Sequence, residues 1–253
     1  MKIAIISDIH GNDTALKAVF AHIDAMGDVE RIYCLGDVVG YGPAPETCID
    51  LLRERCELTL MGNHDYALIN SPIGFNPVAA GAIHWTRDRL EPGFLSMPKK
   101  QKRWEWINNL PERHWIGEDL LVHASPRDNI FEYVLPDDPS YAPDKIESIM
   151  DMIRRNVYIG HTHRPGIITS EPYFYTPTDL GMEYEFRAGE KLIINVSSVG
   201  QPRDHDPRAC YVTVTEAGLT YHRVPYDIED VVKRVMAEKN LDDYCGLRLR
   251  DGR

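Results

Sequence analysis

The sequence predicts an α/β fold in which strands and helices alternate in the first half and strands dominate the second half. Three observations support this class. Short apolar runs alternate with longer segments of helical periodicity up to about residue 61. Polar clusters rich in Asp, His and Gly follow several of the apolar runs. From residue 166 onward, short runs of strand-forming residues recur between turn residues.

The first half is expected to form a parallel β-α-β-α-β unit. Strands are expected at residues 3–7, 32–35 and 58–61, and helices at 12–26 and 45–55. Asn12 or Asp13 can cap the first helix, and Pro45 suits the start of the second. Leu16 and Val19 lie on the apolar face of the first helix.

The middle of the chain is expected to be mainly helical. Residues 64–110 read as helices with a break at 93–98, and a further helix is expected at 144–154. Apolar runs predict strands at 120–122 and 157–159. The proline-containing segment 125–144 predicts a long loop, which is expected to lie over the functional site formed by the polar clusters described below. The basic run 99–103 is interpreted as a solvated helix start, with a polyanion-binding patch as the alternative.

The second half is expected to form another, mostly antiparallel sheet that packs on the first. Its strands are expected at residues 166–169, 184–187, 191–196, 209–214 and 219–224. An apolar stripe that includes Val231 and Val235 predicts a terminal helix, and residues 247–250 are expected to lie in a loose tail. We expect a single domain over residues 1–253, with a core to about residue 224 and the helix and tail over 225–253.

Composition limits the classes of function. The chain has 253 residues, and its 43% hydrophobic content is ample for a core. A net charge of −11 disfavours long nucleic acid as a partner, although bound cations can make the local charge suitable for a short nucleotide. Five scattered cysteines indicate reduced thiols. With no signal peptide and no apolar run of membrane-spanning length, we expect a cytoplasmic protein without a membrane partner.

The polar clusters carry the side chains that bind divalent metals. They are Asp8-Ile9-His10, Gly36-Asp37, Gly62-Asn63-His64-Asp65, His123 and Gly160-His161-Thr162-His163. Each follows an apolar run, and strand ends in an open α/β sheet gather where ligands bind. Carboxylate, imidazole and amide oxygen suit Mn, Fe and Zn. The number of these groups is sufficient for two metals that share one carboxylate, which predicts a hydrolytic two-metal site.

In order and spacing, these clusters resemble the signature of the calcineurin-like metallophosphoesterase superfamily, and the chain is most similar to its short bacterial phosphoesterases. The resemblance covers roughly residues 1–224. It implies a four-layer αββα sandwich, in which two mixed β-sheets are flanked by helices and a dinuclear metal site lies at strand ends. It also implies two ligand sets that share Asp37. One set is Asp8, His10, Asp37 and His163, and the other is Asp37, Asn63, His123 and His161.

The resemblance further implies a metal-dependent phosphoesterase. Two metals lower the pKa of a bound water and clamp the charge that develops on the phosphoryl group. His64 would contact the phosphoryl oxygen or protonate the leaving group, and Asp65 would orient its imidazole. Mn, Fe or Zn is expected as the cofactor, and Ni or Co also accepts such ligands.

Three further residues are candidates for substrate contact. Arg127 and Arg203 lie in loops that could reach the site, and a guanidinium group binds phosphate through two parallel hydrogen bonds. The alternative is a surface salt bridge to Asp128 or Asp204. Tyr41 could contact the leaving group or serve only in packing.

The sequence leaves the substrate and the oligomeric state open. The run from Gly36 to Gly42 lacks the Asp-Arg pair of the Ser/Thr protein phosphatases, which disfavours a phosphoprotein substrate. Phosphodiesters, phosphomonoesters and nucleotides, including dinucleoside polyphosphates, all suit the same metal centre, and specificity would come from residues 66–98 and 125–144. Two other functions are considered: a catalytically silent metal-binding scaffold, and a nuclease acting on longer nucleic acid.

Overall fold

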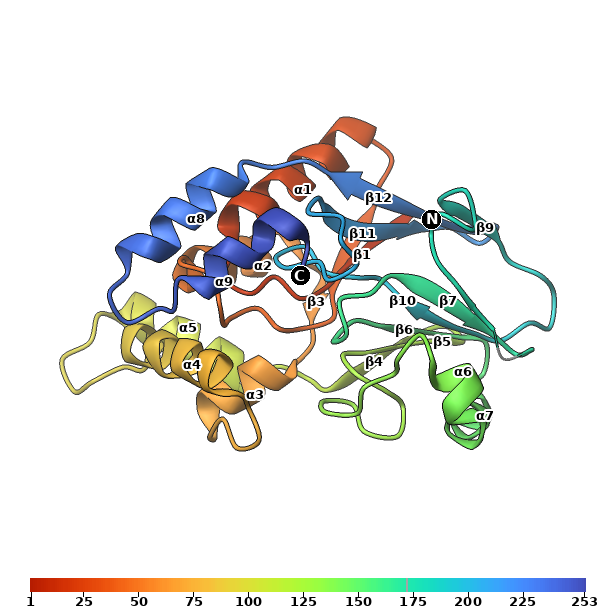
Figure 1. The fold of residues 1–253 in the computed structure, drawn as a ribbon, viewed down its shortest axis with the longest axis horizontal. Helices are drawn as coiled ribbons and strands as arrows, with labels where there is room; N and C mark the ends of the chain where they lie inside the picture. Colours follow the sequence, from red (N-terminus) through yellow and green to blue (C-terminus); the bar gives the residue numbers. More distant parts are fainter. Residues whose placement is uncertain (172) are drawn as a thin grey trace.

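The computed structural model of the protein describes residues 1–171 and 173–253. Within these residues, two six-stranded sheets pack face to face, and helices cover both outer faces (Figure 1). The four-layer arrangement of two mixed sheets between helices is therefore confirmed.

The first sheet has the strand order β3-β2-β1-β11-β12-β9. Its strands are β1 (Ile3–Ile6), β2 (Arg31–Cys34), β3 (Leu58–Thr59), β9 (Glu183–Glu185), β11 (Ala209–Val214) and β12 (Gly218–Val224). As predicted, β1, β2 and β3 run parallel. The placement of β9, β11 and β12 in a second sheet was wrong, because β11 pairs antiparallel with the free edge of β1 and extends the first sheet.

The second sheet has the order β4-β5-β6-β10-β7-β8. Its strands are β4 (Arg113–Ile116), β5 (Asp119–Val122), β6 (Asn156–Ile159), β7 (Gly166–Thr169), β8 (Phe174–Tyr175) and β10 (Leu192–Asn195). The three central strands β5, β6 and β10 run parallel, and the outer strands pair antiparallel. The sheet is therefore mixed rather than mostly antiparallel. The sequence did not predict the edge strands β4 and β8, whose side chains are exposed or only half-buried.

Three apolar cores hold the layers together. Ile5 and Ile194 lie in the core between the sheets. Helices α1 (Asp13–Met26) and α2 (Pro45–Arg55) cover the outer face of the first sheet, and α7 (Pro143–Met152) covers that of the second (Figure 1). The Asn12 side chain caps α1 by accepting a hydrogen bond from the Ala15 amide at 3.0 Å, as expected.

The remaining helices lie between β3 and the end of the chain, and the last two, α9 and η1, are short. The helices are α3 (Asn63–Ile69), α4 (Pro77–Leu90), α5 (Pro98–Asn108), α6 (Asp138–Tyr141), α8 (Ile228–Ala237), α9 (Tyr244–Leu247) and the 3-10 turn η1 (Arg248–Asp251). The expected loose tail is instead folded, because Leu249 is buried beside Val235 and Cys245. Its packing partners lie far away in sequence, so local periodicity could not predict them. The predicted loop 125–144 likewise contains the short helix α6.

The basic run at the start of α5 has a structural role. Lys99 and Arg103 both pair with Asp50 of α2, at 2.9 Å and 2.6 Å. These ion pairs tie α5 to α2 and occupy two of the basic groups that the polyanion-patch alternative needed. Among the described residues, no helix has the length and apolar character required to cross a bilayer.

Candidate metal centre

The candidate ligands lie on sharp turns at the ends of strands from both sheets. Asp8, His10 and Asp37 follow β1 and β2, and the two histidines of the 160–163 cluster follow β6. All five have a positive φ, between 49° and 64°, a region that non-glycine residues rarely adopt. The backbone of the Asp-x-His and His-x-His pairs is therefore bent rather than extended. Such backbone strain typically gathers at functional sites.

Two of the turns leave no room for a side chain at neighbouring glycines. A Cβ atom added to Gly160 would lie 2.2 Å from Ser7 Oγ and 2.3 Å from Asp8 Oδ2. A Cβ atom on Gly62 would lie 2.1 Å from Asp37 Oδ1. The glycines of the clusters thus allow the backbone to approach both carboxylates closely.

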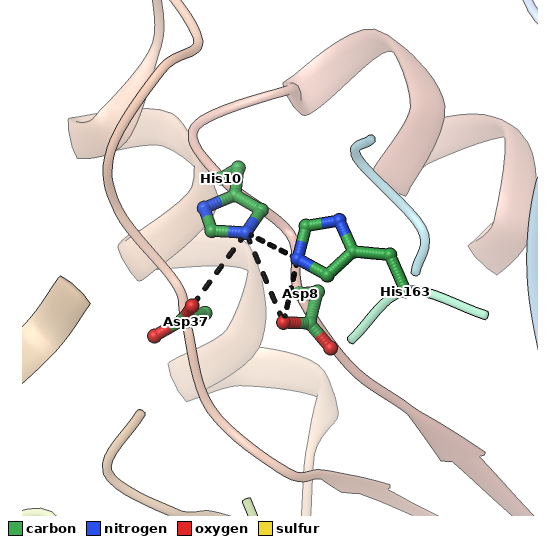
Figure 2. A group of neighbouring side chains, drawn as sticks. All are labelled: Asp8, His10, Asp37 and His163. Carbon is green, nitrogen blue, oxygen red and sulfur yellow. Dashed lines mark hydrogen bonds and ion pairs between the residues drawn. The ribbon is translucent and has the colours of Figure 1, made fainter. Parts of the chain in front are cut away.

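The first group of candidate ligands is buried and convergent. Asp8, His10, Asp37 and His163 each offer one donor atom, and these atoms lie within 4.8 Å of one another (Figure 2). The distances from Asp8 Oδ1 are 3.1 Å to His163 Nε2 and 3.8 Å to His10 Nε2. Asp8 Oδ1 is buried and has no hydrogen-bond partner among the described residues.

The second group shares Asp37 with the first. Asp37, His123 and His161 again offer donor atoms within 4.8 Å of one another. The Oδ2 atom of Asp37 is 3.6 Å from His10 Nε2 in the first group and 3.6 Å from His123 Nε2 in the second. Asn63 joins this side, since its Oδ1 lies 3.1 Å from His123 Nε2. The other oxygen of Asp37 accepts a hydrogen bond from the His64 amide at 2.8 Å, which fixes the carboxylate between the groups.

Main-chain carbonyls orient three of the imidazoles. The Nδ1 atoms of His10, His123 and His163 lie 3.1, 3.2 and 2.5 Å from the carbonyl oxygens of Val39, Leu35 and Gln201. A carbonyl only accepts hydrogen bonds, so each Nδ1 carries the proton and each Nε2 presents a lone pair to the centre. In His161 the two nitrogens exchange roles. Its Nε2 lies 3.2 Å from the carbonyl oxygen of Phe131 and carries the proton, so its Nδ1 presents the lone pair.

This arrangement fits bound cations. Nε2 of His10 and Nε2 of His163 lie 3.1 Å apart. Each of these nitrogens carries a lone pair, because the proton of each ring is on Nδ1. Two lone pairs at this distance repel each other unless a cation lies between them. Together with the unpartnered Asp8 Oδ1, the nitrogen and oxygen donors match a dinuclear metal site.

Electrostatics in the metal-free protein favour the same conclusion. Burial raises the pKa of Asp37 well above its usual range, and the nearby Asp8 and Asp65 raise it further. Burial would also raise the pKa of Asp8, but the surrounding histidines, His163 first, lower it below its ordinary value. Burial lowers the pKa of His161 to about 3 and, together with Arg203, that of His163 to about 4. Neutral imidazole is the form that binds metals.

The catalytic candidates His64 and Asp65 start helix α3. His64 Nδ1 is buried against Gly40 without a hydrogen-bond partner among the described residues, so Nε2 is the ring nitrogen available to a substrate. The expected orientation of His64 by Asp65 is not what the hydrogen bonds show. Asp65 instead accepts from the amides of Val38, Val39 and Gly62, at 3.0–3.2 Å, and so fixes the turn that carries Asp37.

A cavity of about 500 Å³ opens over this centre. The candidates that line it are Asp37, Tyr41, Asn63, His64, His161, His163 and Arg203. Phe75, Phe131 and Tyr133 form an aromatic rim, and the centre of the Tyr133 ring lies 4.0 Å from that of His161, with the two planes tilted by 31°. They come from the two segments, 66–98 and 125–144, to which we assigned specificity.

The other substrate candidates have different outcomes. Arg127 is not among the lining residues and pairs with Glu132 at 3.3 Å, rather than with Asp128. Arg203 lines the cavity, and Asp204 pairs with Arg223 instead. Sequence reasoning missed Arg248, which reaches the cavity from η1. No motif marks it, and only the buried packing of the C-terminal turn brings it to the site.

Comparisons with known proteins agree with this geometry. Residues 1–165 match the family model described as calcineurin-like phosphoesterase. An uncharacterized protein of Methanocaldococcus jannaschii is 33% identical over 267 residues, covering 99% of this chain and 98% of that protein. A symmetrical bis(5'-nucleosyl)-tetraphosphatase of Paracidovorax citrulli is 32% identical over 134 residues, which cover 49% of this chain and 44% of that enzyme.

Solved structures show the same fold. The crystal structure of a metallophosphoesterase from Sphaerobacter thermophilus superposes with a TM-score of 0.81 and 34% identity, covering 100% of this chain and 99% of that one. A hypothetical protein of Pyrococcus horikoshii, at 19% identity, shares the fold with a TM-score of 0.76 over 100% of this chain and 98% of its own. The chain therefore belongs to the calcineurin-like phosphoesterase family and is a metal-dependent phosphoester hydrolase.

Proposed function

We propose that the enzyme hydrolyses a small phosphoester, and that its preferred substrate is a nucleotide. Asp8, His10, Asp37 and His163 would hold one metal, and Asp37, Asn63, His123 and His161 the other. The observation that carries this assignment is the position of Asp37 Oδ2, 3.6 Å from a histidine of each group. Mn, Fe or Zn suits these donors, and Co or Ni is also accepted.

When bound, the two metals supply Lewis acidity, which makes water nucleophilic near neutral pH and offsets phosphoryl charge. The protein's own residues position the substrate and move a proton. His64 Nε2 faces the cavity and would donate a proton to the leaving oxygen. Burial and, next, Arg203 lower the pKa of His64 in the free enzyme. The negative charge of a bound phosphate raises that pKa again, so His64 would acquire its proton with the substrate.

Three observations support a small nucleotide as the substrate. The aromatic rim offers faces on which a base can stack, and Phe131 and Tyr133 have exposed fractions of 43% and 50%. The Paracidovorax relative is named for hydrolysis of a dinucleoside polyphosphate, although it matches only half of this chain. A cavity of about 500 Å³ also suits a small molecule rather than a folded protein.

A substrate panel tests the proposal. Manganese-loaded enzyme is given p-nitrophenyl phosphate, bis-p-nitrophenyl phosphate, mononucleotides and a dinucleoside polyphosphate. We expect the highest kcat/KM for a nucleotide and a lower KM than for the aryl ester. Equal or better turnover of the aryl esters would contradict the nucleotide preference. Metal-loaded enzyme that cleaves no ester at all would contradict the proposed reaction and favour the scaffold alternative.

A further inference from the structure

Two arginines line the cavity without an acidic side chain as partner. Arg203 Nη2 donates to Gln201 Oε1 at 2.8 Å, and its Nε is buried without a hydrogen bond. Arg248 Nε donates to the main-chain oxygen of Arg253 at 2.5 Å. Across residues 1–171 and 173–253, no aspartate or glutamate forms an ion pair with either, although Arg223 and Arg250 beside them are both paired.

Both arginines are held in place by the fold around the metal centre. The Arg203 amide donates to the carbonyl of His163 at 3.2 Å, which ties its loop to a candidate ligand. Arg248 lies one residue before buried Leu249, and the turn is fixed further by the His205 amide, which donates to the Gly252 carbonyl at 3.0 Å. Figure 1 shows the C-terminus in the middle of the molecule beside α9, rather than extending away from it.

Tyr41 connects the two arginines with the catalytic candidates. Its ring lies 4.7 Å from that of His64 and 4.9 Å from that of His10, and the guanidinium carbon of Arg203 lies 5.9 Å from its centre. Tyr41 also shares an apolar cluster with Leu249, next to Arg248. The cavity wall therefore continues from the metal centre past Tyr41 and Arg203 to Arg248.

Among the described residues, no Asp or Glu side chain compensates the charges along this wall, and the anionic contact of Arg248 is the oxygen of Arg253, the last residue of the sequence. Burial and then the charge of Arg203 lower the pKa of Arg248. Two guanidinium groups that face one cavity repel each other, and the chain as a whole carries a net charge of −11. An anion between them would remove this repulsion, and the fork of a guanidinium group matches phosphate oxygens.

On the basis of the proposed function, we propose that Arg203 and Arg248 form a second phosphate subsite beside the metal centre. Water would attack the phosphoryl group at the metals, the P–O–P bond to the next phosphate would break, and that phosphate, held between the two arginines, would keep the bridging oxygen, take the proton from His64 and leave. The enzyme would then prefer substrates with at least two consecutive phosphates. Both arginines lie outside residues 1–165 that match the family model, so this subsite belongs to the C-terminal part of this chain.

Binding of two ligands that differ by one phosphate tests the subsite. AMP and α,β-methylene ADP, each with a methylene group in place of its 5′ ester oxygen so that neither can be hydrolysed, are titrated by calorimetry into manganese-loaded, full-length protein. We expect wild type to bind the diphosphate at least about tenfold more tightly. Arg248→Gln should remove most of this preference, a loss of about tenfold or more, as expected for a lost charge-assisted hydrogen bond. Arg248→Lys, which keeps the charge, should retain part of it.

Arg250→Gln is the matched control. Arg250 lies on the same turn, but it points to Glu229 at 2.7 Å and its side chain is 47% exposed. It should keep the full preference for the diphosphate. Metal content and thermal unfolding of each variant verify that it is folded and loaded. An equal loss of affinity for both ligands in Arg248→Gln would show that Arg248 binds the phosphate at the metals. No loss of affinity would show that Arg248 does not bind the ligand. Either result would overturn the proposal.

The subsite and the proposed function fail in different ways. If no ester is hydrolysed but the diphosphate preference depends on Arg248, the subsite stands and the proposed reaction falls. If esters are hydrolysed while wild type binds AMP and the diphosphate equally, the reaction stands and the subsite falls.

Discussion

The metal centre depends on residues in an uncommon backbone conformation. Asp8, His10, Asp37, His161 and His163 all have positive φ, and each such residue costs about 1–3 kcal/mol unless the surroundings hold it. The surroundings do so through hydrogen bonds. The His161 amide donates to Asp8 Oδ2 at 3.0 Å, and the amides of residues 38 and 39 donate to Asp65. These turns orient the donor atoms from both sheets toward one centre.

Removal of the His64 imidazole should slow the reaction without removing the metals. His64→Ala should lower kcat by about 10²- to 10⁴-fold, because general-acid catalysis contributes this much, while metal content stays that of wild type. The loss should be greater for an alkyl phosphate than for p-nitrophenyl phosphate, whose leaving group needs no proton. Steady-state kinetics with both esters measure this difference. His84→Ala, which alters an exposed histidine of α4, should match wild type.

The close approach at Gly160 predicts a strong effect of a single methyl group. Gly160→Ala should lower the free energy of unfolding by about 1–3 kcal/mol, since its Cβ would overlap Ser7 and Asp8. Gly81→Ala on helix α4 is the control, with open space around the new Cβ, and it should raise stability by up to about 1 kcal/mol. Urea unfolding of the metal-free proteins measures both. Equal effects of the two substitutions would argue against the packing described around Asp8.

The sequence indicated the chemistry of the site better than its geometry. The Asp, Asn and His clusters predicted which side chains converge, because their spacing matched a known signature. The left-handed turns could not be predicted, since they depend on long-range hydrogen bonds such as that between residues 161 and 8. The role of Asp65 was misjudged for the same reason, and Arg248 had no local pattern to mark it.

At the scale of elements, most helices and strands agree with local periodicity, but their pairing does not follow from it. Helices α1 and α2 were predicted within one residue of their ends. The strands β11 and β12 were predicted in sequence and misplaced in space, because an apolar run does not specify which edge it pairs with. Figure 1 shows β11 beside β1 in the first sheet and β12 beside β11. The edge strands β4 and β8 of the second sheet were missed because their half-exposed residues lack a clear alternation.

A half-buried histidine pair between α1 and β12 predicts a pH-dependent stability. His222 accepts or donates a hydrogen bond with Thr213 at 2.8 Å, and its ring lies 5.4 Å from that of His22. Burial, then His22 and Lys2, lower its pKa from 6.5 to about 4. Between these pH values the unfolded chain binds a proton that the folded protein does not. The free energy of unfolding should therefore decrease as the pH falls from about 6.5 to about 4, and level off below.

His222→Gln removes this contribution. Urea unfolding of chelator-treated wild type and variant is compared at pH 7 and at pH 4.5, so that metal release does not contribute. The stability of wild type relative to the variant should be lower at pH 4.5 than at pH 7. His84→Gln, on the surface of α4, should follow wild type at both values. A constant difference between wild type and His222→Gln would contradict the expected protonation behaviour.

For the whole molecule, the metal centre connects the two sheets. The loops after β1 and β2 of the first sheet carry Asp8, His10 and Asp37, and Asn63 begins helix α3 after β3. The loops after β5 and β6 of the second sheet carry His123, His161 and His163. Figure 2 shows His163 beside Asp8 and His10 of the first sheet, with Asp37 on the other side of His10. Tyr221 makes a second connection, since its hydroxyl lies 3.0 Å from the carbonyls of Gly166 and Asn195 in the other sheet. Metals bound here should therefore stabilise the packing of the sheets.

Removal of the metals should lower the stability of the whole fold. Ligand binding to the folded state alone contributes about 4 kcal/mol when the free metal exceeds its Kd by roughly 1,000-fold. We expect chelation to lower the Tm of wild type by several degrees and readdition of Mn to restore it. Asp8→Asn should show a smaller shift, because it loses an anionic donor in the first group. Differential scanning calorimetry measures both, and a Tm that does not respond to chelation would contradict the connecting role.

The central claim is a pair of metals that share Asp37 and act together in hydrolysis. The most direct test titrates Mn into chelator-stripped enzyme, while bound metal per chain and p-nitrophenyl phosphate turnover are measured in the same samples. The account predicts that turnover is absent in stripped enzyme and appears mainly as the second metal binds. It also predicts that Asp37→Asn lowers turnover by at least about 100-fold at equal free Mn. Turnover that survives chelation, or that is complete with one bound metal per chain, would contradict the account.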